Sequence, residues 1–211
     1  MEKTYKFLGY FLIILIPLTF AGFYQTYFKG FPRFDENIDT YVHFHAFIAL
    51  VWILMLISQP ILILNKKFKL HRKIGRLSFI VFPFLILSFI PRMIRIIQME
   101  ELRIIFFPLA DCVLLILFYL LAIYNRKTTA KHMRYMIATA IVFLGPTVGR
   151  IGPYLLAWGD VLTQSVQYLI TFLILISLII YDKRNSREYK PYIVASAGYF
   201  FHALVFYLIF L

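Results

Sequence analysis

The feature that most constrains this chain is a series of long apolar runs, separated by short stretches that carry most of the charge. A run of about 20 apolar residues can cross a bilayer as a helix, because a helix rises about 1.5 Å per residue and the hydrocarbon core is about 30 Å thick. With 62% hydrophobic and 15% charged residues, the composition excludes a soluble domain, a disordered chain and a disulfide scaffold. The sequence therefore predicts an all-α polytopic membrane protein.

The apolar runs predict one bundle of seven transmembrane helices over residues 1–211. Their ranges are 6–28, 41–64, 74–98, 103–124, 133–157, 162–181 and 190–211. The charged lead before the first run is not followed by a signal-type cleavage site, so we expect that helix to be retained. The fifth helix is the weakest, because Pro146 and Pro153 each remove a backbone hydrogen bond. Gly145 and Gly149 in the same helix match the small-xxx-small pattern of close helix packing.

Lys and Arg are distributed unevenly between the two sides of the predicted bundle. Sixteen of the 22 lie in four stretches on one side, which are residues 1–6, 65–76, 125–134 and 182–190. Three lie on the other side, and they are Lys29, Arg33 and Arg103. The positive-inside rule then places the N-terminus in the cytoplasm and the C-terminus outside a bacterial inner (plasma) membrane. We assign the net charge of +12 to topology and to anionic lipid headgroups, and not to nucleic-acid binding.

Polar side chains inside the predicted helices gather in the outer half of the membrane. Such groups are costly there, are usually held inside the bundle by partners, and often mark function. Six of the seven helices contribute, with the residues His43, His45, Arg92, Arg95, Asp111, Arg150, Gln164, Gln167 and His202. Asp111 is the only carboxylate inside a predicted helix, so we expect an ion pair with one of the three arginines, of structural or functional importance. For Arg95 we favour a contact with outer headgroups.

Four histidines form two candidate pairs, His45 with His202 near the outer side and His71 with His132 at the cytoplasmic edge. Neutral imidazole is the natural axial ligand of haem iron, and two such pairs would give a transmembrane electron path. Hydrogen-bonded histidines in the outer pair, and headgroup contacts for the inner pair, explain the same residues. His43 and His45 point about 200° apart on a regular helix, so both reach one metal only if the helix start is irregular. The single cysteine, Cys112, is expected to be a small core residue.

From the second to the fifth predicted helix, the chain resembles a bacterial family of predicted membrane proteins with no assigned function. The resemblance covers about 110 residues and is carried by His45, Gln59, Leu70-His71-Arg72 with Gly75-Arg76, His132-x-Arg134 and Arg150. It implies an architecture but no reaction. More weakly, the histidine layout also resembles that of the two-haem membrane cytochromes, without their fixed spacing of paired histidines on two adjacent helices.

Three functions remain open at this point, and whether the chain is an enzyme is open with them. The leading one is a cytochrome-like or metal-binding protein that passes electrons to a redox partner, with haem or metal ligands at His45, His202, His71 and His132. The second is a transporter or lipid-handling protein that binds a small polar or anionic substrate through Arg92, Arg150, Asp111, Gln164 and Gln167. The third is a membrane hydrolase that holds zinc or another metal ion with His43, His45, His202 and Asp111.

Overall fold

The computed structural model describes residues 5–34 and 38–211, and every regular element within them is helical. Six segments of this described part are long and apolar enough to cross a membrane: Thr40–Leu64, Phe68–Gln98, Leu102–Tyr124, Thr129–Leu155, Asp160–Arg184 and Lys190–Phe210. The prediction of an all-α, multi-pass membrane protein is thus confirmed. The helices form two compact units, an N-terminal unit of Met1–Glu100 and a C-terminal unit of Glu101–Leu211.

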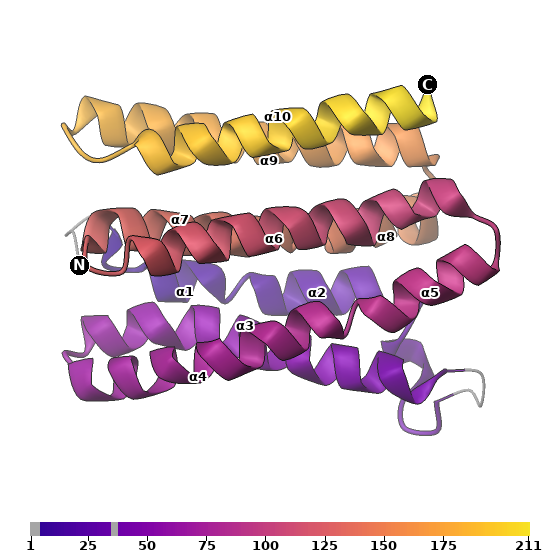
Figure 1. The fold of residues 1–211 in the computed structure, drawn as a ribbon, viewed down its shortest axis with the longest axis horizontal. Helices are drawn as coiled ribbons and strands as arrows, with labels where there is room; N and C mark the ends of the chain where they lie inside the picture. Colours follow the sequence, from indigo (N-terminus) through magenta and orange to yellow (C-terminus); the bar gives the residue numbers. More distant parts are fainter. Residues whose placement is uncertain (1–4, 35–37) are drawn as a thin grey trace. The chain divides into compact units, whose positions relative to one another are not determined.

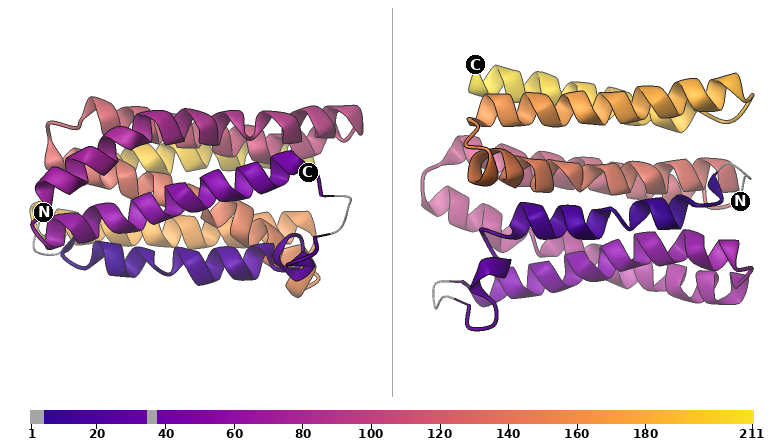
Figure 2. Two further views of the ribbon diagram at one scale, coloured as in Figure 1. Left: turned by 90° about the horizontal axis from the view of Figure 1, so that it is seen from below. Right: turned by 180° about the vertical axis from the view of Figure 1, so that it is seen from behind.

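The N-terminal unit is centred on one long helix, α3, which packs against α1 and against α4. Figure 2 shows the first two short helices running alongside α3. The elements of this unit are α1 (Leu8–Leu12), α2 (Leu15–Phe23), the 3-10 turn η2 (Phe28–Gly30), α3 (Thr40–Leu64), α4 (Phe68–Leu87) and α5 (Ile90–Gln98).

The C-terminal unit holds four of the six long apolar segments. Its elements are η3 (Leu102–Ile105), α6 (Phe106–Tyr124), α7 (Thr129–Val142), α8 (Leu144–Leu155), α9 (Asp160–Arg184) and α10 (Lys190–Phe210). Helix α6 packs against α7 and α10, and α9 packs against α8 and α10 (Figure 1). A buried cluster of Phe106, Tyr168, Ala203 and Phe206 joins α6, α9 and α10. This cluster lies next to the polar residues described below.

Two of the long segments are interrupted, and proline explains both interruptions. Helix α4 ends at Leu87, four residues before Pro91, and α7 ends at Val142, four residues before Pro146. The proline ring clashes with the carbonyl of the residue four positions earlier and has no N–H to donate to it, so the first helix ends there. Proline then fits the first turn of the next helix, where the amide would be free in any case. The predicted weakness of the fifth helix is confirmed as a break at Phe143.

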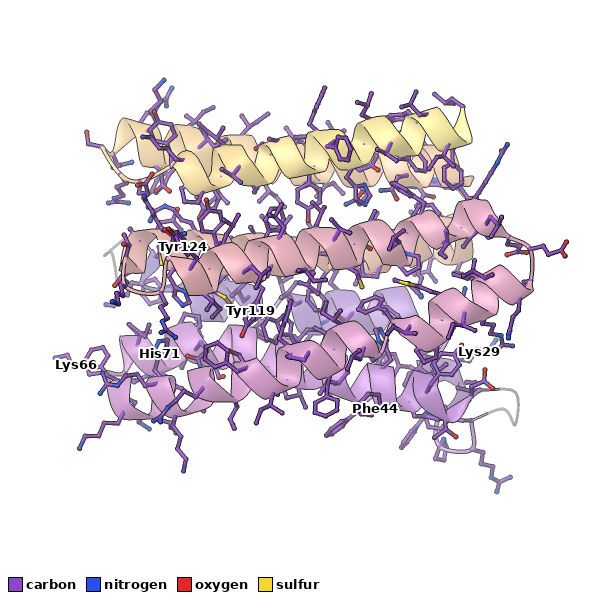
Figure 3. The ribbon with its side chains drawn as sticks, viewed as in Figure 1. Lys29, Phe44, Lys66, His71, Tyr119 and Tyr124 are labelled. Carbon is purple, nitrogen blue, oxygen red and sulfur yellow. The ribbon has the colours of Figure 1, made fainter. Side chains whose placement is uncertain are left out.

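The first predicted helix, over residues 6–28, differs from expectation. It is divided into α1 and α2, and the apolar segment Leu8–Phe23 is shorter than the other six. The division falls at Ile13, which again lies four residues before a proline, Pro17. A continuous helix over this range was therefore the wrong expectation, although the segment still follows α3. Figure 3 shows Lys29, beyond the end of α2, and Lys66, beyond the end of α3, at opposite ends of the N-terminal unit.

Contacts at both ends of this first segment show that it runs antiparallel to α3. A Cβ atom on Gly9 would lie only 2.9 Å from the carbonyl oxygen of Ile57, so the backbones touch here. At the other end, the Tyr27 hydroxyl lies 2.9 Å from Nδ1 of His43. The two contact points on α3, at Ile57 and His43, are separated by about 21 Å along the helix axis. The segment therefore accompanies α3 over most of its length.

Close packing in α8 depends on glycines other than the predicted pair. A Cβ atom on Gly152 would lie 2.9 Å from Cβ of Thr163 in α9, so α8 and α9 approach closely at this point. Among the described residues, nothing lies within 4 Å of the corresponding position on Gly149. Gly145 is close-packed, but against Asp111 in α6. The small-xxx-small interpretation was thus wrong for Gly149.

Helix ends also differ from the predicted boundaries, mostly because the terminal turns are polar. Helix α4 begins at Phe68 and α7 at Thr129, before the predicted starts at 74 and 133. Helix α9 extends to Arg184, beyond the predicted end at 181. Long Lys and Arg side chains can bury their stems while the charge stays at the interface, so a hydropathy pattern ends before the helix does. This extension brings Asp182 into a helix.

Candidate functional site

Four polar side chains from three helices meet inside the C-terminal unit. Nδ1 of His202 (α10) lies 2.8 Å from the Tyr168 hydroxyl (α9), and its Nε2 lies 3.7 Å from Oδ1 of Asp111 (α6). Tyr199, one turn before His202, is 1% exposed, and His202 is 5% exposed. This buried set of Asp111, Tyr168, Tyr199 and His202 is called the polar site below.

Helix α8 completes the surroundings of Asp111. A Cβ atom on Gly145 would lie 3.0 Å from both carboxylate oxygens, so a larger residue here would require the carboxylate to shift. Arg150, further along α8, acts electrostatically on Asp111 with its positive charge. Its guanidinium also donates to the carbonyl of Pro146 at 2.9 Å. Arg150 is thus the arginine of the predicted set that acts on Asp111, and a direct ion pair between the two stays a prediction.

Aromatic rings surround His202. The Phe106 ring packs edge-on at 4.8 Å between centroids, and the Tyr168 ring packs at 5.6 Å. Phe206, one turn further along α10, is fully buried against Phe106. Apolar rings of this kind lower the local dielectric, which strengthens the interaction between the histidine and Asp111.

Two polar atoms of the site have no hydrogen-bond partner within the described part of the chain. They are the hydroxyl oxygen of Tyr199 and Nε2 of His202. Most buried polar side-chain atoms are paired, so each exception calls for an explanation. Both atoms belong to one site, which makes a shared explanation by function reasonable.

The predicted substrate residues Gln164 and Gln167 are buried and hydrogen-bonded within α9. Nε2 of Gln164 donates to Oε1 of Gln167 at 2.6 Å, and Gln167 donates to Thr171 at 3.4 Å. Together with Tyr168 they form a polar stripe at spacings of three and four residues, which is one face of a helix. This periodic stripe is the signal that could have identified Tyr168 from the sequence.

The two histidines at the start of α3 have different neighbours. Nδ1 of His45 lies 2.8 Å from Oγ of Ser88, whose hydroxyl proton is donated to the Leu85 carbonyl at 2.5 Å. Ser88 must therefore accept from Nδ1, which leaves the lone pair of a neutral His45 on Nε2. His43 instead contacts Tyr27. The two imidazoles thus contact residues of different elements, Ser88 after α4 and Tyr27 after α2.

His71 in the N-terminal unit and His132 in the C-terminal unit also have defined partners. With the Gln59 amide in the orientation that satisfies both of its polar atoms, its nitrogen donates to Nδ1 of His71, and its oxygen accepts from the Gly75 amide at 3.2 Å. Nδ1 of His132 donates to the carbonyl of Ala122 at 2.8 Å. A neutral His71 thus has its proton on Nε2, whereas a neutral His132 has its lone pair there.

The histidines do not fit a bis-histidine haem within either unit. In the N-terminal unit, His45 lies on α3 about 21 Å along the axis from Gln59, the partner of His71. In the C-terminal unit, the partners of His202 and His132 on α6 are Asp111 and Ala122, which lie about 16 Å apart. The predicted haem pairs each take one histidine from each unit, and they remain predictions that the absorption spectrum of the purified protein tests.

A zinc site has no ligand set in the described residues. No group of three or more His, Cys, Asp or Glu side chains within them is arranged to hold a metal ion. Cys112, next to Asp111, is a buried free thiol, as expected of a core residue. The polar site itself offers one carboxylate and one imidazole, fewer protein ligands than the three that a catalytic zinc ion needs.

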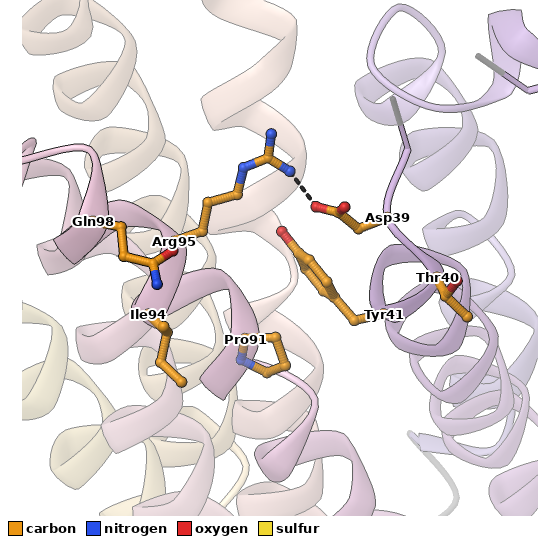
Figure 4. A pocket seen from close by; sticks show the side chains of 7 residues that line it. All are labelled: Asp39, Thr40, Tyr41, Pro91, Ile94, Arg95 and Gln98. Carbon is orange, nitrogen blue, oxygen red and sulfur yellow. Dashed lines mark hydrogen bonds and ion pairs between the residues drawn. The ribbon is translucent and has the colours of Figure 1, made fainter. Parts of the chain in front are cut away.

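The arginines of α5 have a different environment from the one expected. Arg95 forms an ion pair with Asp39, and both side chains are about half exposed, at 45% and 48%. Figure 4 shows this pair beside Tyr41, in an open depression of about 540 Å³. The sequence analysis did not anticipate this acidic partner, and the favoured contact of the half-exposed Arg95 with outer headgroups stays a prediction. Arg92 is exposed on the same helix.

A buried ion pair was missed by the sequence analysis. Nε of Arg134 (α7) donates to Oδ2 of Asp182 (α9) at 2.7 Å, and both side chains are 0% exposed. Asp111 is therefore not the only carboxylate inside a helix. Arg134 was counted as a cytoplasmic surface charge, but its charge is neutralised inside the C-terminal unit. The signal was hidden because Asp182 lies just beyond the predicted sixth helix, and Arg134 lies in the charged first turn of the predicted fifth helix.

Comparison of the chain with protein-family models, with curated proteins and with solved structures finds no match.

Proposed function

We propose that this chain is a multi-pass protein of the bacterial inner membrane that binds and carries a small polar or anionic substrate in its C-terminal unit. The supporting observation is the polar site, where two buried polar atoms have no hydrogen-bond partner among the described residues. Leaving such a group unpaired costs about 1–3 kcal/mol. A substrate that pairs with these atoms on binding accounts for their retention.

The chemistry of the polar site suits a ligand with several hydrogen-bonding groups. The Tyr199 hydroxyl can donate or accept a hydrogen bond, and the Asp111 carboxylate accepts one. When Nδ1 of His202 accepts a hydrogen bond from Tyr168, Nε2 of the same ring carries a proton and can donate a hydrogen bond to a ligand. Arg150 adds a positive charge, and Gln164 and Gln167 extend the polar lining along α9. Arg92, by contrast, is an exposed residue of the N-terminal unit and is not included.

The single cysteine provides an assay for ligands. Because Cys112 is buried, a thiol-reactive fluorescent dye labels it only when the purified protein unfolds. A ligand at 100 times its dissociation constant stabilises the folded state by about 2.7 kcal/mol. We expect one class among sugars, amino acids, monocarboxylates and polyamines to raise the unfolding temperature in a concentration-dependent manner.

A matched pair of tyrosine variants tests where that ligand binds. Tyr199→Phe removes a hydroxyl that has no hydrogen-bond partner among the described residues, so we expect unchanged or slightly higher stability without ligand and a much smaller shift with ligand. Tyr168→Phe removes the hydrogen bond to His202 and should lower stability by about 0.5–1.5 kcal/mol. The proposal fails if no compound stabilises the protein, or if Tyr199→Phe leaves the ligand shift intact.

For the topology, we propose seven membrane crossings with the N-terminus in the cytoplasm. The segment that includes α1 and α2 accompanies α3 from Gly9 to Tyr27, which supports a seventh crossing. The uneven Lys and Arg distribution supports the orientation even after Arg134 is set aside as a buried, paired residue. Lys3, one of the counted charges, lies outside the described residues.

Cysteine labelling tests this topology. In a Cys112→Ala background, Lys6→Cys and Lys67→Cys should resist an impermeant thiol reagent added to intact cells, whereas Lys29→Cys should react. Lys6 and Lys29 are both exposed and flank the first segment, so they differ only if that segment crosses the membrane. Equal labelling of these two variants would reduce the number of crossings to six, and ready labelling at position 67 would reverse the orientation.

A further inference from the structure

We propose that the substrate of the polar site is a small monoanion that binds together with one proton, and that His202 holds this proton. This inference rests on the proposed function and specifies the charge of what the site binds. It follows from the charges of the groups that surround His202 and from the hydrogen bonds of its ring.

In the site that we propose, the charges balance before a ligand binds. An ionised Asp111 lies 3.7 Å from a neutral His202, and the positive charge of Arg150 acts on the carboxylate. An uncompensated charge inside a membrane bundle is strongly disfavoured. A monoanion that binds alone would leave one negative charge in excess, whereas a monoanion with one proton leaves the sum at zero.

His202 can take up a proton without losing a hydrogen bond. In the neutral tautomer that has its proton on Nε2, the Tyr168 hydroxyl donates to Nδ1, 2.8 Å away, and the Nε2 proton faces Asp111 at 3.7 Å. When a proton from solvent binds to Nδ1, the hydroxyl becomes the acceptor. Its own proton can turn to the carbonyl oxygen of His202, which lies 3.4 Å away. Asp111 then provides the counter-charge of the imidazolium.

The donors at the site favour an anion over a cation. The Tyr199 hydroxyl is a buried donor without a hydrogen-bond partner among the described residues, and it interacts electrostatically with Asp111. Arg150 and a protonated His202 are both positive. The carboxylate of the site, Asp111, lies beside His202 and already interacts electrostatically with Arg150, so little of its charge is left to attract a cationic ligand.

The other ionisable groups packed around this part of the unit do not supply the proton equally well. Cys112 follows Asp111 on α6 and is a buried thiol. Helix α7 also packs against α10, and its ionisable side chains lie in its first two turns: Lys131, His132, Arg134 and Tyr135. Of these, His132 contacts α6 about 16 Å along the axis from Asp111. The Asp111–His202 pair, whose atoms Oδ1 and Nε2 lie 3.7 Å apart, is therefore where the site can hold a proton, and the hydrogen bonds of the ring assign the proton to His202.

The test measures how the affinity for simple anions depends on pH. Sodium formate, acetate, lactate and nitrate are titrated at constant ionic strength, with unfolding of the intact protein followed through Cys112. If each anion binds with one proton, the affinity of the wild-type protein increases about tenfold for each unit of decreasing pH. The variant His132→Asn is the control and should keep this dependence, because His132 lies outside the polar site.

Two variants separate the charge balance from a structural effect. In His202→Asn, which keeps an amide near the position of Nδ1, anion affinity should lose its pH dependence and stay at the weak level of the wild-type protein in alkaline buffer. In Asp111→Asn, the site loses its one negative charge, so anions should bind without a proton and the affinity becomes independent of pH but remains high. A purely structural role for either residue would weaken binding without changing the slope against pH.

Several outcomes would overturn the inference. If the anion affinity of the wild-type protein is independent of pH, no proton binds together with the anion. If the slope of affinity against pH is unchanged in His202→Asn, His202 is not the group that holds the proton. If only neutral or cationic compounds stabilise the protein, the inference that the substrate is an anion is wrong, whereas the proposed substrate site stands. If no compound of any class stabilises it, the proposed function and this inference fail together.

Discussion

Replacing Asp182 with Asn is expected to destabilise the protein by about 3–5 kcal/mol, because it leaves a fully buried arginine without its counter-charge. The Arg134 guanidinium lies 2.7 Å from the Asp182 carboxylate, and neither side chain is exposed. A single removal therefore leaves an isolated charge in a low-dielectric interior. Unfolding of the purified protein, followed through Cys112, measures the loss.

The matched controls separate the ion pair from a general effect of substitution. The double variant Arg134→Met with Asp182→Leu removes both charges at similar volume and should recover most of the lost stability. Asp160→Asn changes an exposed carboxylate on the same helix and should shift stability by less than about 0.5 kcal/mol. A loss in Asp182→Asn no larger than that in Asp160→Asn would contradict the structural role of the pair.

Gly152→Ala is expected to destabilise the protein by about 1–3 kcal/mol, since the added methyl group overlaps Thr163 where α8 meets α9. Thr163 is 3% exposed and has little room to move. The matched control is Gly149→Ala on the same helix, where the new Cβ atom meets no described atom within 4 Å. Alanine is the better helix former, so this control should be neutral or slightly stabilising.

The changes in unfolding free energy that these two glycine substitutions cause, relative to the wild-type protein, should therefore have opposite signs or differ by more than about 1 kcal/mol. Equal effects would mean that α8 and α9 do not meet at Gly152. The comparison is sensitive because both substitutions add the same single methyl group, three positions apart on one helix.

The membrane architecture could be predicted from the sequence because long apolar runs have few alternative structures. The interruptions at Pro91 and Pro146 were only partly visible, although a simple rule places them: the preceding helix ends four residues before the proline. Pro60 and Pro83 lie inside continuous helices. A proline alone is therefore an insufficient signal for a break.

The candidate site could be predicted in part. Asp111, His202 and the two glutamines were identified because ionisable and amide groups are conspicuous in apolar runs, and the structure brings the first two together. Tyr168 and Tyr199 were missed as site residues, because tyrosine is common in membrane helices and the sequence does not tell a buried hydroxyl from an interfacial one. Burial and hydrogen bonding, which depend on how the helices pack, make that distinction.

The break at Phe143 has a mechanical consequence for the polar site. Gly145 and Arg150 both lie on α8, which is joined to α7 through this single residue, whereas Asp111 lies on α6. A tilt of α8 about Phe143 would move Gly145 and Arg150 together, because both lie on the same rigid helix. The space above the carboxylate and the positive charge that acts on it would then change in step, so that steric access and electrostatics at Asp111 share a single degree of freedom.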